Sequence, residues 1–221
     1  KIWVCGARGQ IGQAVNDVVD KLEFEMLDTD VDDIDVTDTD EVLRFGEMNR
    51  PDIIINCSGM TDISSCEENP SQAFKVNALG ARNLAIVAAK MQAKMVQLST
   101  DDVFDGRSTE PYTEFDLVNP GTVYGKSKLA GENYVKEFTT KHFIVRSTWV
   151  YGKGHNFIND FLKKVDAGEQ LSIASDQFGS PTSANELARF LLHLVHTSEY
   201  GTYHATNKGV CSRYAFAQEI L

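Results

Sequence analysis

Cysteine pairs, clusters of basic residues and long apolar runs are all missing from this chain. Its four cysteines show no CxxC or similar spacing, which argues against a zinc module or a disulfide framework. Lysine and arginine number 21 against 32 acidic residues, for a net charge of −11, so we expect no nucleic-acid partner. No stretch is long enough to span a membrane or forms a signal-peptide core. We expect a cytoplasmic protein with reduced thiols and no membrane partner.

Short apolar runs alternate with helical patterns along the first two thirds of the chain. The expected strands are 1–5, 24–27, 52–57, 95–100 and 142–150, and the expected helices are 11–19, 40–49, 69–91 and 122–138. Strands that are apolar almost throughout, separated by helices, indicate a parallel sheet covered on both faces. The sequence therefore predicts an α/β fold, a doubly wound parallel sheet of the Rossmann type.

A glycine-rich stretch, GARGQIG (6–12), directly follows the first expected strand and opens the first helix. Its GxxGxxG spacing suits a tight turn, close approach of the backbone to a pyrophosphate, and close packing of helix on strand. The helix N-terminus adds free N–H groups and the positive end of the helix dipole. The predicted contacts with a dinucleotide are Gly6, Arg8, Gly9, Gln10, Ile11 and Gly12.

The acidic residues after the second expected strand bear on the type of dinucleotide. Asp28 ends that strand about 20 residues after the glycines, where a carboxylate can bond the ribose hydroxyls of the adenosine. Asp30, Asp32 and Asp33 follow, and this cluster would repel a 2′-phosphate. Arg8 could offset the repulsion by pairing with such a phosphate. We predict NADH or NADPH as cofactor, with a preference for NADH.

The stretch TVYGKSKLAGE (122–132) places Tyr124 and Lys128 one turn apart on one face of an expected helix. Such a pair is common by chance, and only its position gives it meaning. Thr100 ends the fourth expected strand, and a long irregular stretch, 101–121, follows where ligands bind in open parallel sheets. A phenol beside a fixed ammonium can exchange a proton near neutral pH because the cation lowers its pKa.

Eight stretches, in this order, resemble the extended short-chain dehydrogenase/reductases, and within them the dTDP-4-dehydrorhamnose reductase family. They are GARGQIG (6–12), NCSGMTDISSCE (56–67), FKVNALGARNLA (74–85), LSTDDVFDG (98–106), VYGKSKLAGE (123–132), VRSTWVYG (145–152), DQFGSPT (176–182) and GTYHATNKGVCS (201–212). The glycine loop and the Tyr-x-x-x-Lys pattern are common to the superfamily, whereas DQFGSPT and the STD…VFDG block are specific to this branch.

The resemblance implies reduction of the C4 ketone of dTDP-4-dehydro-6-deoxy-L-mannose to dTDP-L-rhamnose, for cell-surface polysaccharide. Tyr124 would protonate the C4 oxygen while nicotinamide delivers hydride, and Thr100 would hydrogen-bond the same oxygen. Lys128 would bond the nicotinamide ribose and lower the pKa of the tyrosine, so Tyr124 and Lys128 also count as cofactor contacts. The resemblance also implies contacts with the cofactor at Asp35, Val36, Cys57, Ser58 and Gly59, and contacts with the sugar at Thr61, Asp102 and Trp149.

The family pattern also implies a division of the chain. Residues 1–150 would form the dinucleotide-binding domain, to which 171–197 return, and 151–170 with 198–221 would form a sugar-nucleotide lobe. The chain begins without Met and stops inside an expected helix. We therefore expect this lobe to be incomplete, with more chain beyond Leu221.

Several alternatives stay open. Asp102 stands where the family commonly has an aromatic, which leaves room for a reductase or epimerase of another nucleotide sugar. Some members bind magnesium at a dimer interface through a glutamate just after the glycine loop; Ala14 stands there, so we expect no metal, and a homodimer stays open. A non-catalytic NADP-binding regulatory subunit, resembling the methionine adenosyltransferase β subunit, is a further alternative. Packing at a domain junction is the alternative for Trp149, and a structural ion pair for Arg146.

Overall fold

The computed structural model describes residues 1–221 and is built on one six-stranded sheet, in the order β2-β1-β3-β4-β5-β9. Its strands are β1 (Ile2–Cys5), β2 (Met26–Thr29), β3 (Ile53–Asn56), β4 (Lys94–Thr100), β5 (His142–Ser147) and β9 (Gly201–His204). Every neighbouring pair is parallel. The strand order changes direction between β1 and β3, which is the ligand-binding point of a doubly wound sheet. The predicted fold class is confirmed.

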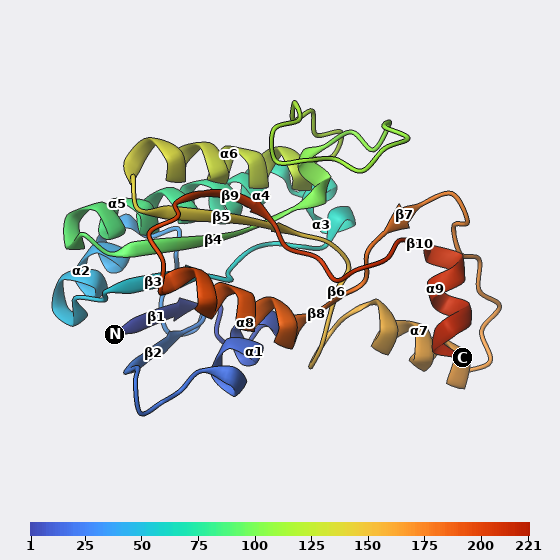
Figure 1. The fold of residues 1–221 in the computed structure, drawn as a ribbon, viewed down its shortest axis with the longest axis horizontal. Helices are drawn as coiled ribbons and strands as arrows, with labels where there is room; N and C mark the ends of the chain where they lie inside the picture. The colour runs from blue at the N-terminus through green and yellow to red at the C-terminus, as the bar shows by residue number, and fades with distance from the viewer.

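Helices cover both faces of this sheet (Figure 1). Helices α1 (Gln10–Val18) and α8 (Ala184–Val195) pack on one face, and α2 (Thr39–Asn49), α5 (Ala81–Met91) and α6 (Val123–Phe138) lie on the other. Alternate residues of each strand point to opposite faces. Ile2 and Val4 of β1 therefore join one buried core, and Trp3 joins the other. The two cores fix the strand ends, where the functional residues lie.

Strand β9 corrects the predicted division of the chain. Residues 201–204 pair with β5 in the main sheet, although the sequence placed them in the lobe. The strand is only four residues long and half-buried throughout, because it lies at the sheet edge. It therefore lacks the continuous apolar run that marks the inner strands.

The helix expected over 69–91 is interrupted. It consists of α4 (Pro70–Phe74), a wide π-helical turn at Lys75–Gly80, and α5. Asn77 in the wide turn accepts the backbone N–H of Met60 at 2.8 Å and donates to Ser127 Oγ at 2.9 Å. A Cβ on Gly131 of α6 would lie 2.3 Å from Asn77 O, so the turn and α6 are in very close contact. Turns of this kind are frequent at functional sites.

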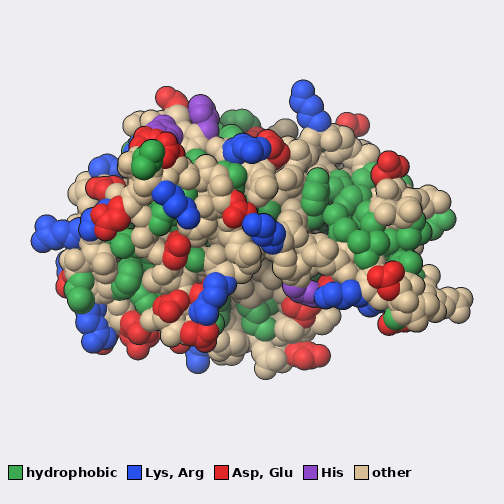
Figure 2. Space-filling model, turned by 90° about the horizontal axis from the view of Figure 1, so that it is seen from below, with side chains coloured by type: hydrophobic (Ala, Val, Ile, Leu, Met, Phe, Trp, Pro, Cys, Tyr) green, Lys and Arg blue, Asp and Glu red, His purple; other side chains and the backbone are tan.

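The chain beyond β5 leaves the sheet at its carboxyl edge and forms a small lobe (Figure 1). Its elements are β6 (Val150–Tyr151) paired with β8 (Thr182–Ser183), β7 (Phe178–Gly179) paired with β10 (Cys211–Ser212), α7 (Phe157–Asp166) and α9 (Arg213–Ile220). Hydrophobic side chains gather on the surface of the lobe (Figure 2), and Phe178, Val210 and Tyr214 are among the exposed ones. None of the helices combines the length and apolar character needed to cross a bilayer.

Candidate active site

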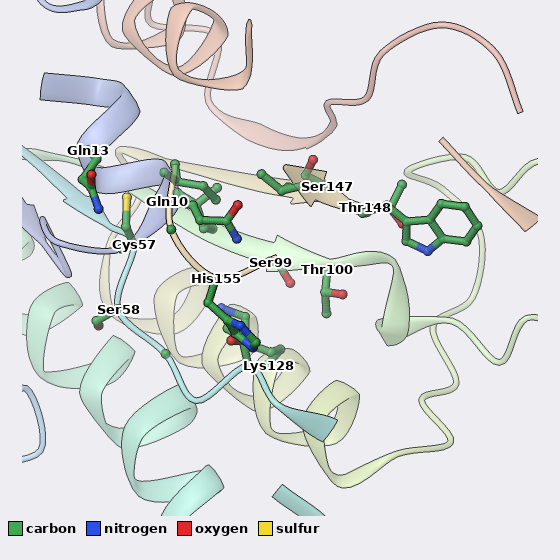
Figure 3. Close-up of a pocket in the computed structure, with 18 of the residues that line it drawn as sticks. Gln10, Gln13, Cys57, Ser58, Ser99, Thr100, Lys128, Ser147, Thr148 and His155 are labelled. Atoms are coloured by element: carbon green, nitrogen blue, oxygen red, sulfur yellow. The ribbon is translucent and has the colours of Figure 1, made fainter. Parts of the chain in front are cut away.

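A cavity of about 520 Å³ opens at the carboxyl edge of the sheet (Figure 3). It brings together the glycine loop, the ends of β3, β4 and β5, and the start of α6. The predicted site residues in its lining are Arg8, Gly9, Gln10, Ile11, Cys57, Ser58, Gly59, Thr61, Thr100, Tyr124, Lys128 and Trp149. Residues far apart in the sequence thus line a single space. Six predicted residues lie outside this lining: Gly6, Gly12, Asp28, Asp35, Val36 and Asp102.

The glycine loop has the geometry of a backbone cradle. Gly6 has a φ of +75°, and a Cβ there would lie 2.8 Å from Ser58 N. A Cβ on Gly12 would lie 2.4 Å from Gly6 O. Gly9 caps α1 without any side-chain hydrogen bond, so the first N–H groups of the helix stay available to an anion. Gly6 and Gly12 therefore shape the loop from behind the cavity wall.

Arg8 is surrounded by the acidic residues that follow β2. Its backbone N–H donates to Asp30 Oδ2 at 2.9 Å, and its guanidinium lies 3.1 Å from Asp32 Oδ2 and 3.5 Å from Asp33 Oδ2. Asp28 is exposed on the strand opposite Val4, and β2 continues one residue beyond it. Asp30 is thus a carboxylate that contacts the glycine loop, and the contact of Asp28 with the adenosine ribose stays a prediction.

Asp35 and Val36 lie farther along the same edge. Asp35 accepts the backbone N–H of Thr37 at 2.8 Å, and Val36 O accepts a hydrogen bond from Asn83 at 2.9 Å. A Cβ on Gly80 would lie 2.8 Å from Val36 Cγ2. These contacts fix the segment between β2 and α2 against the wide turn.

Tyr124 and Lys128 lie in the cavity wall, one helical turn apart on α6. Burial raises the pKa of Tyr124 well above its usual value; a hydrogen bond with Thr100 opposes this shift, whereas the charge of Asp102 adds to it. Burial lowers the pKa of Lys128 to about 8, although Glu132 and Cys57 favour its charged form. The cavity wall therefore holds a protonated phenol and, one helical turn away, an amine whose pKa is about 8.

Glu132 and Arg146 form a buried ion pair next to the cavity wall. Arg146 donates from Nε and Nη2 to the two oxygens of Glu132, at 2.9 and 2.7 Å. Ser99 Oγ donates to Glu132 Oε1 at 2.6 Å. The pair ties α6 to β4 and β5, so Arg146 has the structural partner that the sequence left as one of two readings.

Sequence reasoning gave no role to Asp101, whose carboxylate joins two strand ends. Thr100 Oγ1 donates to Asp101 Oδ1 at 3.1 Å, and Thr148 Oγ1 donates to Asp101 Oδ2 at 2.5 Å. Other lining residues that were not predicted are Gln13, Leu98, Ser99, Ser147, Val150, Lys153, Gly154 and His155. The only signal for Asp101 was its place in the STD block next to Thr100.

Asp102 lies behind Asp101, with its backbone oxygen against α6. A Cβ on Gly125 would lie 2.1 Å from Asp102 O. Burial, with a smaller contribution from Asp101, raises the pKa of Asp102 to about 6. Asp102 is not among the residues that line the cavity, and its contact with the sugar stays a prediction.

Trp149 both lines the cavity and packs at the junction with the lobe. Its backbone has a φ of 45°, which is uncommon for a bulky residue. The Arg213 guanidinium lies 3.6 Å from the ring centroid, and a Cβ on Gly179 would lie 2.6 Å from Trp149 Cε2. The two readings left open for Trp149 are thus not exclusive.

Known proteins match this chain over its whole length. The sequence model described as RmlD substrate binding domain matches residues 1–221. The dTDP-4-dehydrorhamnose reductase of Escherichia coli is 34% identical over 100% of this chain and 77% of that protein. The chain belongs to the dTDP-4-dehydrorhamnose reductase family. The chain is also similar to SpsK, a spore coat polysaccharide biosynthesis protein of Bacillus subtilis, at 35% identity over 100% of this chain and 78% of that protein.

Solved structures of the family share the fold over nearly the whole chain. The dTDP-4-dehydrorhamnose reductase of Clostridium acetobutylicum is 44% identical, with a TM-score of 0.97 over 99% of this chain and 78% of that one. The Bacillus anthracis enzyme, in complex with NADP, is 40% identical, with a TM-score of 0.95 over 99% and 79%. The resemblance drawn from the sequence motifs is confirmed. No group of three His, Cys, Asp or Glu side chains gathers as a metal site requires.

Proposed function

We propose that this chain reduces the C4 ketone of dTDP-4-dehydro-6-deoxy-L-mannose to dTDP-L-rhamnose with NADH or NADPH. One observation carries the proposal: Thr100, Tyr124 and Lys128 line the same cavity that the glycine loop enters. Family membership supplies the substrate class. A non-catalytic binder would have less physical need to keep all three side chains in one wall.

The residues present fit a dinucleotide. The cradle at Gly6 and Gly12 has no room for side chains, and Gln10 Oε1 is buried without a hydrogen-bond partner. The loop and the N-terminus of α1 would hold the pyrophosphate, with Cys57, Ser58 and Gly59 beside the middle of the cofactor. When bound, the reduced nicotinamide supplies the hydride. The acidic residues around Arg8 support a preference for NADH, because they occupy the cation that a 2′-phosphate would need.

Proton transfer falls to Tyr124. Its raised pKa keeps the proton on the phenol. Charged Lys128, held by the same helix, would lower that pKa once it bonds the nicotinamide ribose. Thr100 would orient the ketone oxygen toward the phenol. A hydrogen-bond donor placed in this way contributes about 3 kcal/mol to transition-state stabilisation.

The test follows reduced-cofactor absorbance while the keto sugar nucleotide is added to the protein and to Tyr124→Phe. Oxidation should fall at least about a hundredfold in the variant, because the general acid is lost. Tyr134→Phe is the matched control, since Tyr134 lies on the same helix outside the cavity lining and should leave the rate unchanged.

Other results would point to the remaining alternatives. Cofactor binding without turnover would favour a regulatory subunit. NAD that stays bound to the protein through purification would favour an epimerase, because a reductase must exchange its cofactor. Turnover of a different keto sugar nucleotide would keep the mechanism and change the substrate.

A further inference from the structure

We propose that Ser147, together with Gln10, binds the carboxamide of the nicotinamide and so decides which face of the ring is turned toward the ketone. The proposal rests on the function proposed above and adds the part of the cofactor that these two side chains recognise. Ser147 is not among the residues predicted from the sequence, where Gln10 is predicted only as part of the glycine loop.

Ser147 has a buried hydroxyl that no protein group pairs with. The residue is 6% exposed, ends β5 and lines the cavity. Its Oγ has no hydrogen-bond partner. A buried hydroxyl without a partner is unfavourable, and a ligand group that pairs with it recovers that cost. The partner of this hydroxyl is therefore expected in a ligand that enters the cavity.

The register of the sheet places Ser147 at the reacting end of the cavity. Ser147 on β5 is the direct partner of Thr100 on β4. Neighbouring strands lie about 4.8 Å apart, and paired residues point to the same face of the sheet. The proposed function assigns the ketone oxygen to Thr100 and Tyr124. A hydride donor for that ketone has to lie beside the same strand ends, within reach of Ser147.

Gln10 approaches this region from the helix side. It is the first residue of α1, and its side chain extends from that helix toward β4 (Figure 3). Gln10 Oε1 is buried without a hydrogen-bond partner, and a Cβ on Gly152 would lie 4.0 Å from it. Gly152 directly follows β6, five residues beyond Ser147. Two buried oxygens without partners thus belong to the cavity wall, one from α1 and one from β5.

The chemistry of the two oxygens selects a carboxamide. Gln10 Oε1 can only accept a hydrogen bond, whereas the Ser147 hydroxyl can donate one. A primary carboxamide offers N–H donors and a carbonyl acceptor, so it can pair with both groups at once. The pyrophosphate consists of acceptors and cannot pair with Gln10 Oε1, and the nicotinamide ribose is the proposed partner of Lys128. The carboxamide is therefore the part of the cofactor that fits.

Two contacts with the carboxamide would restrict rotation of the ring. The two faces of a nicotinamide are exchanged by a half-turn about its bond to the ribose. That half-turn moves the carboxamide to the other side of the bond axis, so Gln10 Oε1 and Ser147 Oγ would lose their partners. The two side chains therefore favour one face of the ring, and with it one of the two hydrogens at C4.

Cofactor binding without the keto sugar tests each contact separately. NADH is compared with its acetylpyridine analogue, in which a methyl group replaces the NH2 of the carboxamide and the carbonyl oxygen is kept. Ser147→Ala should weaken both cofactors at least about fivefold, because both keep the carbonyl that the hydroxyl meets. Gln10→Met should weaken NADH by a similar factor and should not weaken the analogue, which has no N–H to lose.

Three measurements control for effects on the fold. Ser147→Thr keeps a hydroxyl at the strand end and should bind NADH within about twofold of the unaltered protein. Ser71→Ala, an exposed serine on α4 outside the cavity lining, should change neither Kd. Because the Ser147 hydroxyl has no protein partner, Ser147→Ala should unfold at the same urea concentration as the unaltered protein or at a higher one.

Two binding results would overturn the proposal. The first is a Kd for NADH in Ser147→Ala within twofold of that of the unaltered protein. The second is an equal loss of NADH and its analogue in Gln10→Met. The expected pattern of Kd values in a protein that reduces no keto sugar would support the carboxamide contact and reject the proposed function. Turnover of the keto sugar with unchanged Kd values in both variants would do the reverse.

Deuterium at one C4 position of NADH reports which face of the ring is used during turnover. The unaltered protein should transfer hydrogen from one face only. Ser147→Ala combined with Gln10→Met should transfer from both faces, because nothing then distinguishes the two positions of the carboxamide. Transfer from a single face in the double variant would overturn the choice of face by these side chains.

Discussion

At the residue scale, the pKa of Lys128 lies closer to neutral pH than that of an ordinary lysine. Burial lowers its pKa to about 8. Its charged form is the one that bonds the cofactor ribose and favours ionisation of Tyr124. We predict that kcat/KM for the reduced cofactor falls as the pH rises through about 8, because kcat/KM reports the free enzyme.

The control for Lys128 is an arginine, which stays charged over the whole range. Lys128→Arg should lower the rate by misplacing the cation, and its profile should show no alkaline fall near this pH. If kcat/KM of the unaltered protein stayed constant from one pH unit below to one pH unit above 8, the charge of Lys128 would not control the reaction.

Asp102 affects stability in the opposite sense from a salt-bridged carboxylate. Its folded pKa of about 6 lies above the ordinary value of 3.8, so the folded state binds more protons than the unfolded state between these values. Stability attributable to this group therefore falls as the pH rises through that window. We predict that Asp102→Asn raises the free energy of unfolding at pH 7 by about 1 kcal/mol, after allowance for solvent screening.

Urea unfolding at two pH values checks this prediction. The gain should shrink as the pH falls toward the ordinary value of 3.8 and disappear below it, where the carboxyl is protonated in both states. An equal gain at both pH values would mean that packing, rather than charge, is responsible.

At the scale of elements, Gly6 in the glycine loop and Gly106 in the stretch 101–121 separate the cost of backbone strain from the cost of a steric clash when a Cβ is added. Gly6 and Gly106 both have positive φ angles, of +75° and +67°. An alanine at Gly106 meets nothing within 4 Å, whereas one at Gly6 collides with the backbone at Ser58. We predict that Gly106→Ala costs about 1 kcal/mol of stability from backbone strain alone, and Gly6→Ala about 1–3 kcal/mol more.

Cofactor titration completes that comparison. Gly6→Ala should weaken the binding of reduced cofactor at least about tenfold, because the loop must shift away from β3. Gly106→Ala should bind normally. Equal stability losses in the two variants would show that the contact with Ser58 relaxes freely.

The same elements show how far the sequence could be interpreted. The inner strands and the GxxGxxG loop were predictable because continuous burial and a tight turn each leave a local pattern. β9 was not, since an edge strand needs no apolar run. The contact of Asp30 with the glycine loop depends on where β2 ends, which the apolar pattern does not resolve to the residue. The hydrogen bond between Asp101 and Thr148 joins residues 47 positions apart, so no local pattern could predict it.

At the scale of the whole molecule, net charge bears on the choice of cofactor. The chain carries −11, and NADPH has one phosphate more than NADH. Salt screens exposed charges, since the Debye length is about 10 Å at 0.1 M and about 3 Å at 1 M. We predict that NADH binds more tightly than NADPH at low salt, and that the ratio of their Kd values approaches one as salt is added.

Fluorescence titrations at two salt concentrations measure this ratio. Asp32→Asn combined with Asp33→Asn should narrow the advantage of NADH at low salt, because Arg8 then keeps only its 3.8 Å contact with Asp30 and can meet a 2′-phosphate. Asp40→Asn, an exposed residue on α2, is the control for charge alone. Tighter binding of NADPH at low salt would reject the preference for NADH.

The packing of Trp149 has an optical consequence. The chain has two tryptophans: Trp3 is buried on β1, where its Nε1 donates to Thr29 Oγ1 at 2.8 Å, and Trp149 lies in the cavity wall beneath Arg213. Indole emission overlaps the absorption band of a reduced nicotinamide, so the wall residue is a donor for resonance energy transfer to the bound cofactor. In Trp149→Phe, Trp3 would be the only remaining tryptophan and would give the background fluorescence. The efficiency of energy transfer from Trp149 would therefore report the distance between the start of the lobe and the bound nicotinamide.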